Sequence, residues 1–155
     1  MDSLEGKKAP TFALEGSNGK KHSIKDYIGK RIVIFFYPRD NTPGCTKESC
    51  GFRDLNKEIQ DLNTVVLGVS KDSLASHNKF IEKFSLPFVL LSDPETKMMA
   101  KYGAWGEKVL YGKTSIGCIR STVIVDEKGK VIKHWRKVPK AETHPAKVLE
   151  ILQSL

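Results

Sequence analysis

The segment Arg31-Ile32-Val33-Ile34-Phe35-Phe36-Tyr37 is, from Ile32 onward, a continuous run of β-branched and aromatic residues. A strand with one wet face alternates apolar and polar residues, whereas an uninterrupted apolar run is typical of a strand covered on both faces. Pro38 follows directly, and proline cannot donate to a sheet ladder, so we expect the strand to end there. The segment therefore predicts a buried strand of a mainly parallel α/β sheet.

A helix is predicted directly after this strand, over residues 42–60. Thr42 offers a hydroxyl at the N-cap and Pro43 suits the first helical position. Apolar side chains then recur at spacings of three and four, at Phe52, Leu55 and Ile59. In open α/β sheets ligands bind at the carboxyl ends of the strands, so the start of this helix is where we expect a site.

The rest of the hydrophobic pattern alternates between strands and helices. Further strands are predicted at residues 9–15, turning through Asn18-Gly19, and at 64–70, 88–91, 119–126 and 131–138; further helices at 73–84, 94–102 and from Thr143 onward. This order predicts a thioredoxin-like α/β fold, with a mainly parallel central sheet extended by an antiparallel hairpin. No linker or repeat interrupts the chain, so we expect residues 1–155 to form a single domain.

Composition places the chain among globular proteins. Of 155 residues, 39% are hydrophobic and 28% are charged, which allows a sizeable core. The longest apolar run, 32–37, is far below the roughly 18 residues of a membrane span. The opening Met1-Asp2-Ser3-Leu4-Glu5 lacks the basic-then-apolar layout of a signal peptide. We therefore expect a cytoplasmic protein with no membrane partner.

The formal charge of +8 permits an acidic partner without demanding one. Basic residues are spread along the chain, and the densest stretch, 133–137, alternates with apolar positions as a half-exposed strand would. No zinc-finger spacing or RNA-binding signature accompanies it. We therefore expect no nucleic-acid partner.

Three cysteines are too few for a secreted disulfide framework, so a thiol here is expected to serve chemistry. Cys45 is the third residue of the predicted helix, where unpaired backbone N–H groups and the helix dipole favour thiolate over thiol. Gly44 adds no side chain beside the sulfur, so a small substrate could approach. The residues predict a nucleophilic thiol in an exposed anion pocket; the alternative is a buried cysteine at a helix start.

Cys50 lies five residues further along the same helix. In an intact helix this spacing separates the two Cα atoms by roughly 8 to 9 Å, beyond the roughly 4.4 to 6.8 Å that a disulfide needs. A Cys45–Cys50 bond therefore requires local unwinding, and the alternative is that Cys50 is a core thiol. The spacing is not C-x-x-C, and the four histidines, which share no pattern, are interpreted as ordinary polar residues: His22, His77, His134 and His144. We expect neither a metal site nor a cofactor.

Arg120 interrupts an otherwise apolar strand. A buried guanidinium needs an anion, so Arg120 is predicted either to point at the Cys45 sulfur or to pair with Glu48 or an Asp for structure alone. Glu48, placed in the first helical turn, suits both capping and holding such an arginine. Cys118 shares the alternating face of Arg120, and a buried inert thiol is its preferred interpretation.

At these residues the chain resembles the peroxiredoxins, and within them the bacterioferritin comigratory protein or peroxiredoxin Q group. The signature Pro-x-x-x-Thr-x-x-Cys stands at Pro38, Thr42 and Cys45, and the longer form of the group is complete from Tyr37 to Cys50. The resemblance implies a thioredoxin fold with peroxiredoxin insertions. It also implies that Cys45 is the peroxidatic cysteine and Cys50 the resolving cysteine, with Thr42, Arg120 and Pro38 shaping the pocket. The family pattern does not require Cys118.

The resemblance implies a thiol-dependent peroxidase acting on hydrogen peroxide and alkyl hydroperoxides. Cys45 would pass through a sulfenic acid to an intramolecular disulfide with Cys50, which thioredoxin or a similar dithiol would reduce. A monomer is expected, with a dimer as the alternative. Two other functions remain open: a thiol-disulfide oxidoreductase, against which the missing C-x-x-C weighs, and a redox-sensing thioredoxin-like module.

Overall fold

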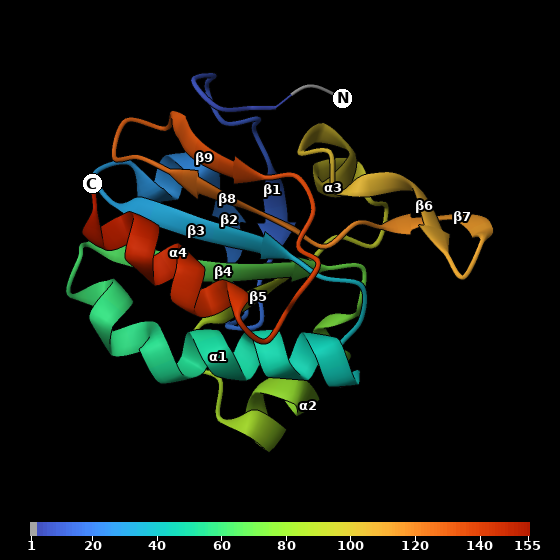
Figure 1. Ribbon diagram of the computed structural model, residues 1–155. Helices are drawn as coiled ribbons and strands as arrows, with labels where there is room; N and C mark the ends of the chain where they lie inside the picture. The colour runs from blue at the N-terminus through green and yellow to red at the C-terminus, as the bar shows by residue number, and fades with distance from the viewer. Residues whose placement is uncertain (1–2) are drawn as a thin grey trace.

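The computed structural model describes residues 3–155 and is built on a five-stranded sheet (Figure 1). The strand order is β5-β4-β3-β8-β9, formed by β3 (Arg31–Phe36), β4 (Thr64–Ser70), β5 (Val89–Ser92), β8 (Ser121–Val125) and β9 (Val131–Trp135). The strands β3, β4 and β5 are parallel, whereas β8 runs antiparallel to β3 and β9 antiparallel to β8. The thioredoxin-like α/β fold is confirmed, with an antiparallel hairpin joined to a parallel half.

The central strand β3 supplies side chains to two cores. Ile32, Ile34 and Phe36 belong to a cluster with the N-terminal segment and α3 (Lys97–Lys101). The alternating residues of the strand belong to a second cluster with α1 (Pro43–Gln60), α2 (Leu74–Phe84) and α4 (His144–Gln153), which lie together on one side of the sheet in Figure 1. A strand buried on both faces has no polar positions, which explains the uninterrupted apolar run.

The Asn-Gly signal near the N-terminus marks a real hairpin. The strand β1 (Ala13–Glu15) pairs with β2 (Lys21–Ser23), and the short 3-10 helix η1 (Ile24–Tyr27) follows. The strand predicted from residue 9 is shorter than expected. Residues 1–2, part of the opening stretch considered for a signal peptide, lie outside the described residues. Within residues 3–155, no helix is both long and apolar enough to cross a bilayer.

The predicted helix 94–102 is only α3, Lys97–Lys101. The carboxylate of Asp93 accepts the backbone N–H of Met99 at 2.9 Å and that of Met98 at 3.4 Å. Thr96, at φ 60°, lies in the left-handed region immediately before the helix. Asp93 thus caps the helix from outside, and the intervening residues form a turn.

A second hairpin was not predicted. The strands β6 (Trp105–Leu110) and β7 (Lys113–Cys118) pair antiparallel and project from the body of the molecule (Figure 1). Their turn places Tyr111 at φ 52° and Gly112 at φ 76°. Two-residue hairpin turns of this kind usually carry Asn-Gly or Asp-Gly, so a tyrosine there gave no signal.

Candidate active site

The start of α1 places Cys45 at the carboxyl end of β3. Pro43 is the first helical residue and Cys45 the third, as predicted. Thr42 is the N-cap residue with extended backbone, but its hydroxyl does not cap the helix. It donates instead to the carbonyl oxygen of Arg39 at 2.8 Å. The prediction that the Thr42 hydroxyl caps the helix is therefore wrong. The hydroxyl stabilises the turn of the preceding loop and accepts no hydrogen bond from the N–H groups of the first helical turn.

Arg120 reaches the same edge of the sheet from the opposite direction. Ser121, the first residue of β8, is paired with Phe36, the last residue of β3. Arg120 therefore precedes β8, and the expectation that it lies inside a strand is wrong. Its carbonyl oxygen accepts the N–H of Val138 at 2.8 Å, which fixes the backbone here. Because the strands are antiparallel, the residue before β8 lies beside the loop that leads to Cys45.

The guanidinium of Arg120 bridges two side chains of α1. Its Nη2 donates to the Sγ atom of Cys45 at 3.1 Å, and its Nη1 donates to Oε1 of Glu48 at 2.7 Å. The Glu48 side chain is fully buried and that of Arg120 is 17% exposed. The two partners predicted as alternatives for Arg120 are thus bound together.

Burial controls the charges of this group. Burial raises the pKa of Glu48 to about 7, although Arg120 opposes the rise. The second carboxyl oxygen of Glu48 is buried and has no hydrogen-bond partner among the described residues. Burial also opposes the charge of Arg120, but Glu48 and then Cys45 outweigh it, so the pKa of Arg120 is raised. Two acidic groups therefore share one guanidinium.

Glu48 is the sixth residue of α1, so the expectation that it lies in the first helical turn is wrong; that turn holds no acidic residue. Cys45 itself is 1% exposed, so the expected exposed pocket around its sulfur is also wrong. A Cβ atom at Gly44 would lie 3.2 Å from Nη2 of Arg120. The glycine therefore leaves room for the guanidinium beside the sulfur.

A hollow of about 950 Å³ opens beside Arg120. Its walls include Pro38, as predicted for a pocket-shaping residue, and apolar side chains of the hairpin and the following segments, among them Trp105, Ile119 and Val138. Trp135 is not among the lining residues. The hollow provides space for an organic group next to the guanidinium.

The other two cysteines differ in their surroundings. Cys50 is half-buried in the unbroken helix α1, and all three cysteines are free thiols. Five helical positions keep its Cα roughly 8 to 9 Å from that of Cys45, so a bond between them needs unwinding. Cys118 ends β7, is 5% exposed and belongs to the core. Burial raises the pKa of Cys118 to about 12, which supports an inert thiol.

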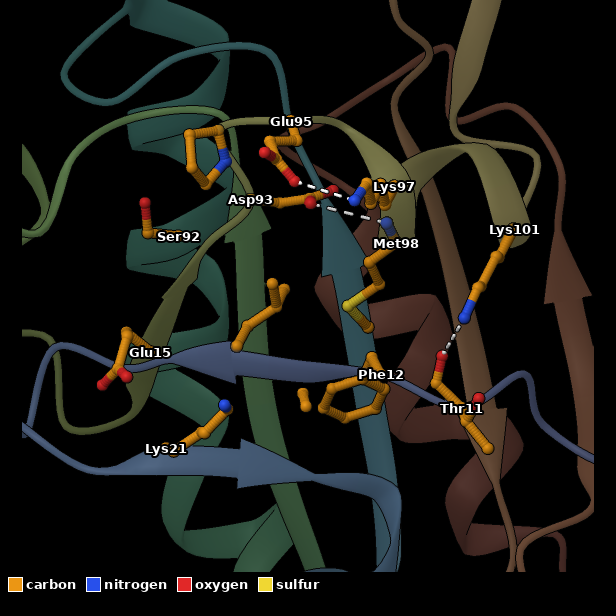
Figure 2. Close-up of a pocket in the computed structure, with 13 residues that line it drawn as sticks. Thr11, Phe12, Glu15, Lys21, Ser92, Asp93, Glu95, Lys97, Met98 and Lys101 are labelled. Atoms are coloured by element: carbon orange, nitrogen blue, oxygen red, sulfur yellow. Dashed lines mark hydrogen bonds and ion pairs between the residues drawn. The ribbon is translucent and has the colours of Figure 1, made fainter.

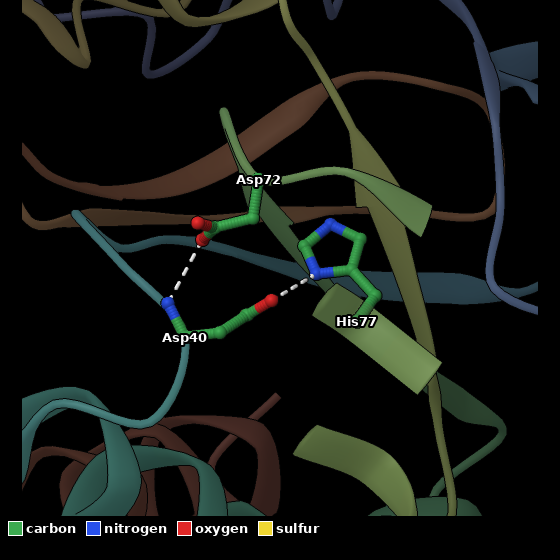
Figure 3. A group of neighbouring side chains, drawn as sticks. All are labelled: Asp40, Asp72 and His77. Carbon is green, nitrogen blue, oxygen red and sulfur yellow. Dashed lines mark hydrogen bonds and ion pairs between the residues drawn. The ribbon is translucent and has the colours of Figure 1, made fainter. Parts of the chain in front are cut away.

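The histidines are more deeply buried than ordinary polar residues. All four are less than 9% exposed, and each has a hydrogen-bond partner. Burial lowers the pKa of His144 to about 4, and its Nε2 lies 2.8 Å from Oγ1 of Thr122. His77 pairs with Asp40, a residue that the sequence indicated only as part of the motif (Figure 3). No spacing in the sequence indicated this pair.

A second hollow, of about 460 Å³, lies between β1 and the segment before α3 (Figure 2). Its walls mix apolar and charged side chains, including Phe12, Met98 and Lys101. Lys101 donates to the carbonyl oxygen of Thr11 at 2.9 Å, and Asp93 is engaged by α3. None of the predicted site residues lines it, so the candidate active site is the group around Cys45.

Known proteins resemble this chain in sequence and in fold. The sequence profile of the AhpC/TSA family matches residues 5–134. Peroxiredoxin Bcp of Bacillus subtilis is 45% identical over 150 residues, which cover 97% of this chain and 95% of that protein. The structure of a cysteine-to-serine mutant of Xylella fastidiosa PrxQ matches with a TM-score of 0.92 at 31% identity, covering 99% of this chain and 98% of that one. The Xanthomonas campestris bacterioferritin comigratory protein, studied for its alkyl peroxide reduction activity, matches with a TM-score of 0.87 at 36% identity, covering 92% and 90%. The chain belongs to the AhpC/TSA family, and within it to the peroxiredoxins of the Bcp or peroxiredoxin Q group.

Proposed function

We propose that this chain is a thiol-dependent peroxidase that reduces hydrogen peroxide and alkyl hydroperoxides through Cys45. The observation that carries the proposal is the 3.1 Å contact between Nη2 of Arg120 and the Cys45 sulfur, at the start of an 18-residue helix. A cation and the positive end of a helix dipole both stabilise the thiolate, which is the nucleophilic form. The alkyl peroxide reduction studied in the Xanthomonas relative agrees with this chemistry.

In the first step the Cys45 thiolate attacks the terminal oxygen of the hydroperoxide. A sulfur–oxygen bond forms and the oxygen–oxygen bond breaks, so sulfur loses two electrons and becomes a sulfenic acid. The departing oxygen takes up a proton and leaves as an alcohol, or as water when the substrate is hydrogen peroxide. Arg120 stabilises the charge that moves from sulfur to oxygen, because its guanidinium already lies at the sulfur.

In the second step Cys50 resolves the sulfenic acid. The first turns of α1 unwind, the Cys50 sulfur bonds to the Cys45 sulfur, and the sulfenic oxygen leaves as water. A dithiol such as thioredoxin then reduces the disulfide by exchange. The spacing of the cysteines in one helix and the partial exposure of Cys50 support this route.

We also propose that residues 1–155 act as one domain and as a monomer in the cytoplasm. The two cores share strand β3, and Cys45, Cys50 and Arg120 come from one chain, so a second copy is not needed to complete the site. A reducing compartment keeps the three thiols available. Size-exclusion chromatography with light scattering tests the monomer.

Peroxide consumption coupled to thioredoxin tests the function. Cys45→Ser should abolish turnover, because serine lacks the nucleophilic sulfur, whereas Cys118→Ala should retain it. Activity that survives in Cys45→Ser contradicts the proposal. Insulin reduction distinguishes a thiol-disulfide oxidoreductase, and a rate constant with hydrogen peroxide no higher than that of free cysteine would favour a redox-sensing module.

A further inference from the structure

We propose that His77 is a positioning residue for the peroxidase reaction: its buried ion pair with Asp40 holds the loop 38–42 and the first turn of α1 in the folded arrangement in which Cys45 meets peroxide. This inference rests on the proposed function. Figure 3 shows the group, in which the Asp40 side chain points at the imidazole of His77 and its backbone N–H at Asp72.

Asp40 lies where a small movement of the chain would shift the start of α1. It lies in the loop between β3 and α1, five residues before Cys45. Asn41 follows in the left-handed region at φ 60°. Thr42 is the N-cap residue of α1, and its hydroxyl donates to the Arg39 carbonyl oxygen. Such a short, sharply turned connection transmits any movement of Asp40 to the start of the helix.

Three separate elements hold Asp40. Directly after β3, the Tyr37 hydroxyl donates to its Oδ1 at 2.5 Å. From α2, Oγ of Ser76 donates to its Oδ2 at 2.8 Å, and Nδ1 of His77 lies 2.8 Å from the same oxygen. From the loop after β4, Oδ2 of Asp72 accepts the backbone N–H of Asp40 at 2.8 Å. The loop is therefore anchored through this one residue to β3, α2 and the β4–α2 connection.

Both nitrogens of the buried His77 ring have a hydrogen-bond partner. Its side chain is fully buried, with Nδ1 facing the Asp40 carboxylate and Nε2 lying 2.9 Å from the carbonyl oxygen of Leu91. A carbonyl oxygen can only accept, so Nε2 donates to Leu91, and a second proton must lie between Nδ1 and Oδ2 of Asp40 to hold these two atoms together. Loss of this proton would leave a ring lone pair facing an acceptor. A buried charge pair is costly to break from one side, which makes it an effective tie.

The charges around the ring are consistent with this tie. Asp40 faces the ring from the loop, Asp72 faces it from the β4–α2 connection, and Leu91 contributes a backbone carbonyl from β5. Burial, with Asp40 as the next cause, raises the pKa of Tyr37 well above its usual value. The phenol therefore stays protonated and remains a donor to the carboxylate.

The three side chains are also of the types that bind metals, with ligand atoms within 4.8 Å of one another. The hydrogen bonds favour a cluster that holds the loop in place over a metal-binding site. A nitrogen that donates a proton to Asp40 offers no lone pair, and Oδ2 of Asp72 already accepts from Ser70 at 2.6 Å and from the Asp40 N–H. The cluster satisfies its own donors and acceptors.

The His77–Asp40 pair has opposite effects on sulfenic acid formation and on disulfide closure. Reaction with peroxide needs the first turn of α1 folded, because Arg120 meets the Cys45 sulfur only there. Disulfide closure needs the same turn unwound, because the helix keeps Cys45 and Cys50 too far apart. A contact that stabilises the folded loop therefore speeds the first step and slows the second. Releasing it should also protect the sulfur from over-oxidation, because the sulfenic acid is resolved sooner.

The experiment measures both steps separately in His77→Asn, by rapid acid quench and mass spectrometry of sulfenic acid and disulfide. The asparagine amide can still donate to Asp40, but it carries no charge, and it has no second nitrogen to donate to the carbonyl oxygen of Leu91. We expect sulfenic acid formation to slow roughly tenfold and disulfide closure to accelerate by a similar factor, each about 1.4 kcal/mol. The matched control is His22→Asn, a buried histidine of the N-terminal hairpin that bonds to Tyr27 and Asn18, where both rates should stay at the wild-type values.

The outcomes separate the two proposals. If the wild-type protein does not react with peroxide, the proposed function fails. If it reacts and the two rates in His77→Asn are unchanged, or fall together, the positioning role is wrong. Should the variant not fold, ¹⁵N NMR of the wild-type protein decides: two protonated ring nitrogens on His77 at neutral pH support the ion pair, and a neutral ring overturns it.

Discussion

Gly44 and Arg120 are in such close contact that a Cβ atom on the glycine would lie 3.2 Å from Nη2 of the arginine. The same Nη2 atom lies 3.1 Å from the Cys45 sulfur. The approach of the guanidinium to the sulfur therefore depends on the missing side chain at position 44. This contact connects the sequence of the helix start to the electrostatics of the site.

Gly44→Ala should separate activity from stability. The added methyl displaces Nη2 by a few tenths of an ångström and weakens its contact with the sulfur, so we expect the second-order rate with hydrogen peroxide to fall roughly tenfold. Alanine favours a helix over glycine by up to about 1 kcal/mol, so the free energy of unfolding should stay the same or rise. Stopped-flow kinetics and urea unfolding measure the two effects. An unchanged rate would show that the guanidinium has room to adjust.

Gly51→Ala, in the same helix, should lower stability without changing the rate of reaction with peroxide. A Cβ atom there would lie 2.8 Å from Cγ of Pro145, in the first turn of α4, and a proline ring cannot rotate away. Overpacking of this kind costs about 1 to 3 kcal/mol, which exceeds the gain in helix propensity. We expect a lower unfolding free energy in urea with an unchanged initial rate of peroxide reaction. A more stable variant would contradict the close packing of α1 against α4.

Cys50→Ser should confine the protein to a single turnover. Cys45 can still form its sulfenic acid, but no neighbouring thiol in the helix condenses with it, so catalytic cycling stops after one equivalent of peroxide and any further equivalent over-oxidises the sulfur. Mass spectrometry should show the sulfenic acid and then the sulfinic acid as peroxide increases. Unaltered cycling with thioredoxin would show that another thiol resolves, and Cys50→Ser/Cys118→Ala would then identify or exclude Cys118.

Glu48→Gln should change how stability depends on pH. The folded protein holds the Glu48 proton up to about pH 7, above the ordinary value of 4.5. Between these pH values the folded state binds more protons than the unfolded state, so the wild-type free energy of unfolding falls as pH rises, by up to about 3 kcal/mol from this group. Below and above this window the contribution is constant.

Glutamine cannot ionise, so the variant does not lose stability between these pH values through this position. Urea unfolding of both proteins at pH 4 and pH 8 should therefore show the variant gaining stability relative to the wild type as pH rises. Comparison with the wild type at each pH cancels the other titrating groups, including His144, whose lowered pKa acts in the opposite direction. Two parallel stability curves would mean that Glu48 has the same pKa in the folded and the unfolded protein.

Much of the arrangement of strands and helices could be predicted from local sequence patterns. The apolar run of β3, the proline after it and the periodicity of α1 identified a buried strand followed by a helix, and Pro43 placed Cys45 at the third helical position. These features depend on backbone geometry within a few residues, which local sequence controls. The hairpin β6–β7 escaped because its turn uses Tyr111 where a glycine or asparagine would have been the signal.

The sequence by itself determined that a thiol stands at the start of a helix, behind a strand buried on both faces. Only the tertiary structure decided which groups surround that thiol. Arg120 is 75 residues from Cys45 and 72 from Glu48, and the pairing of β8 with β3 brings them together. His77 meets Asp40 across 37 residues because α2 packs beside the loop. Polar side chains choose among competing partners by distance, and packing between remote elements sets those distances.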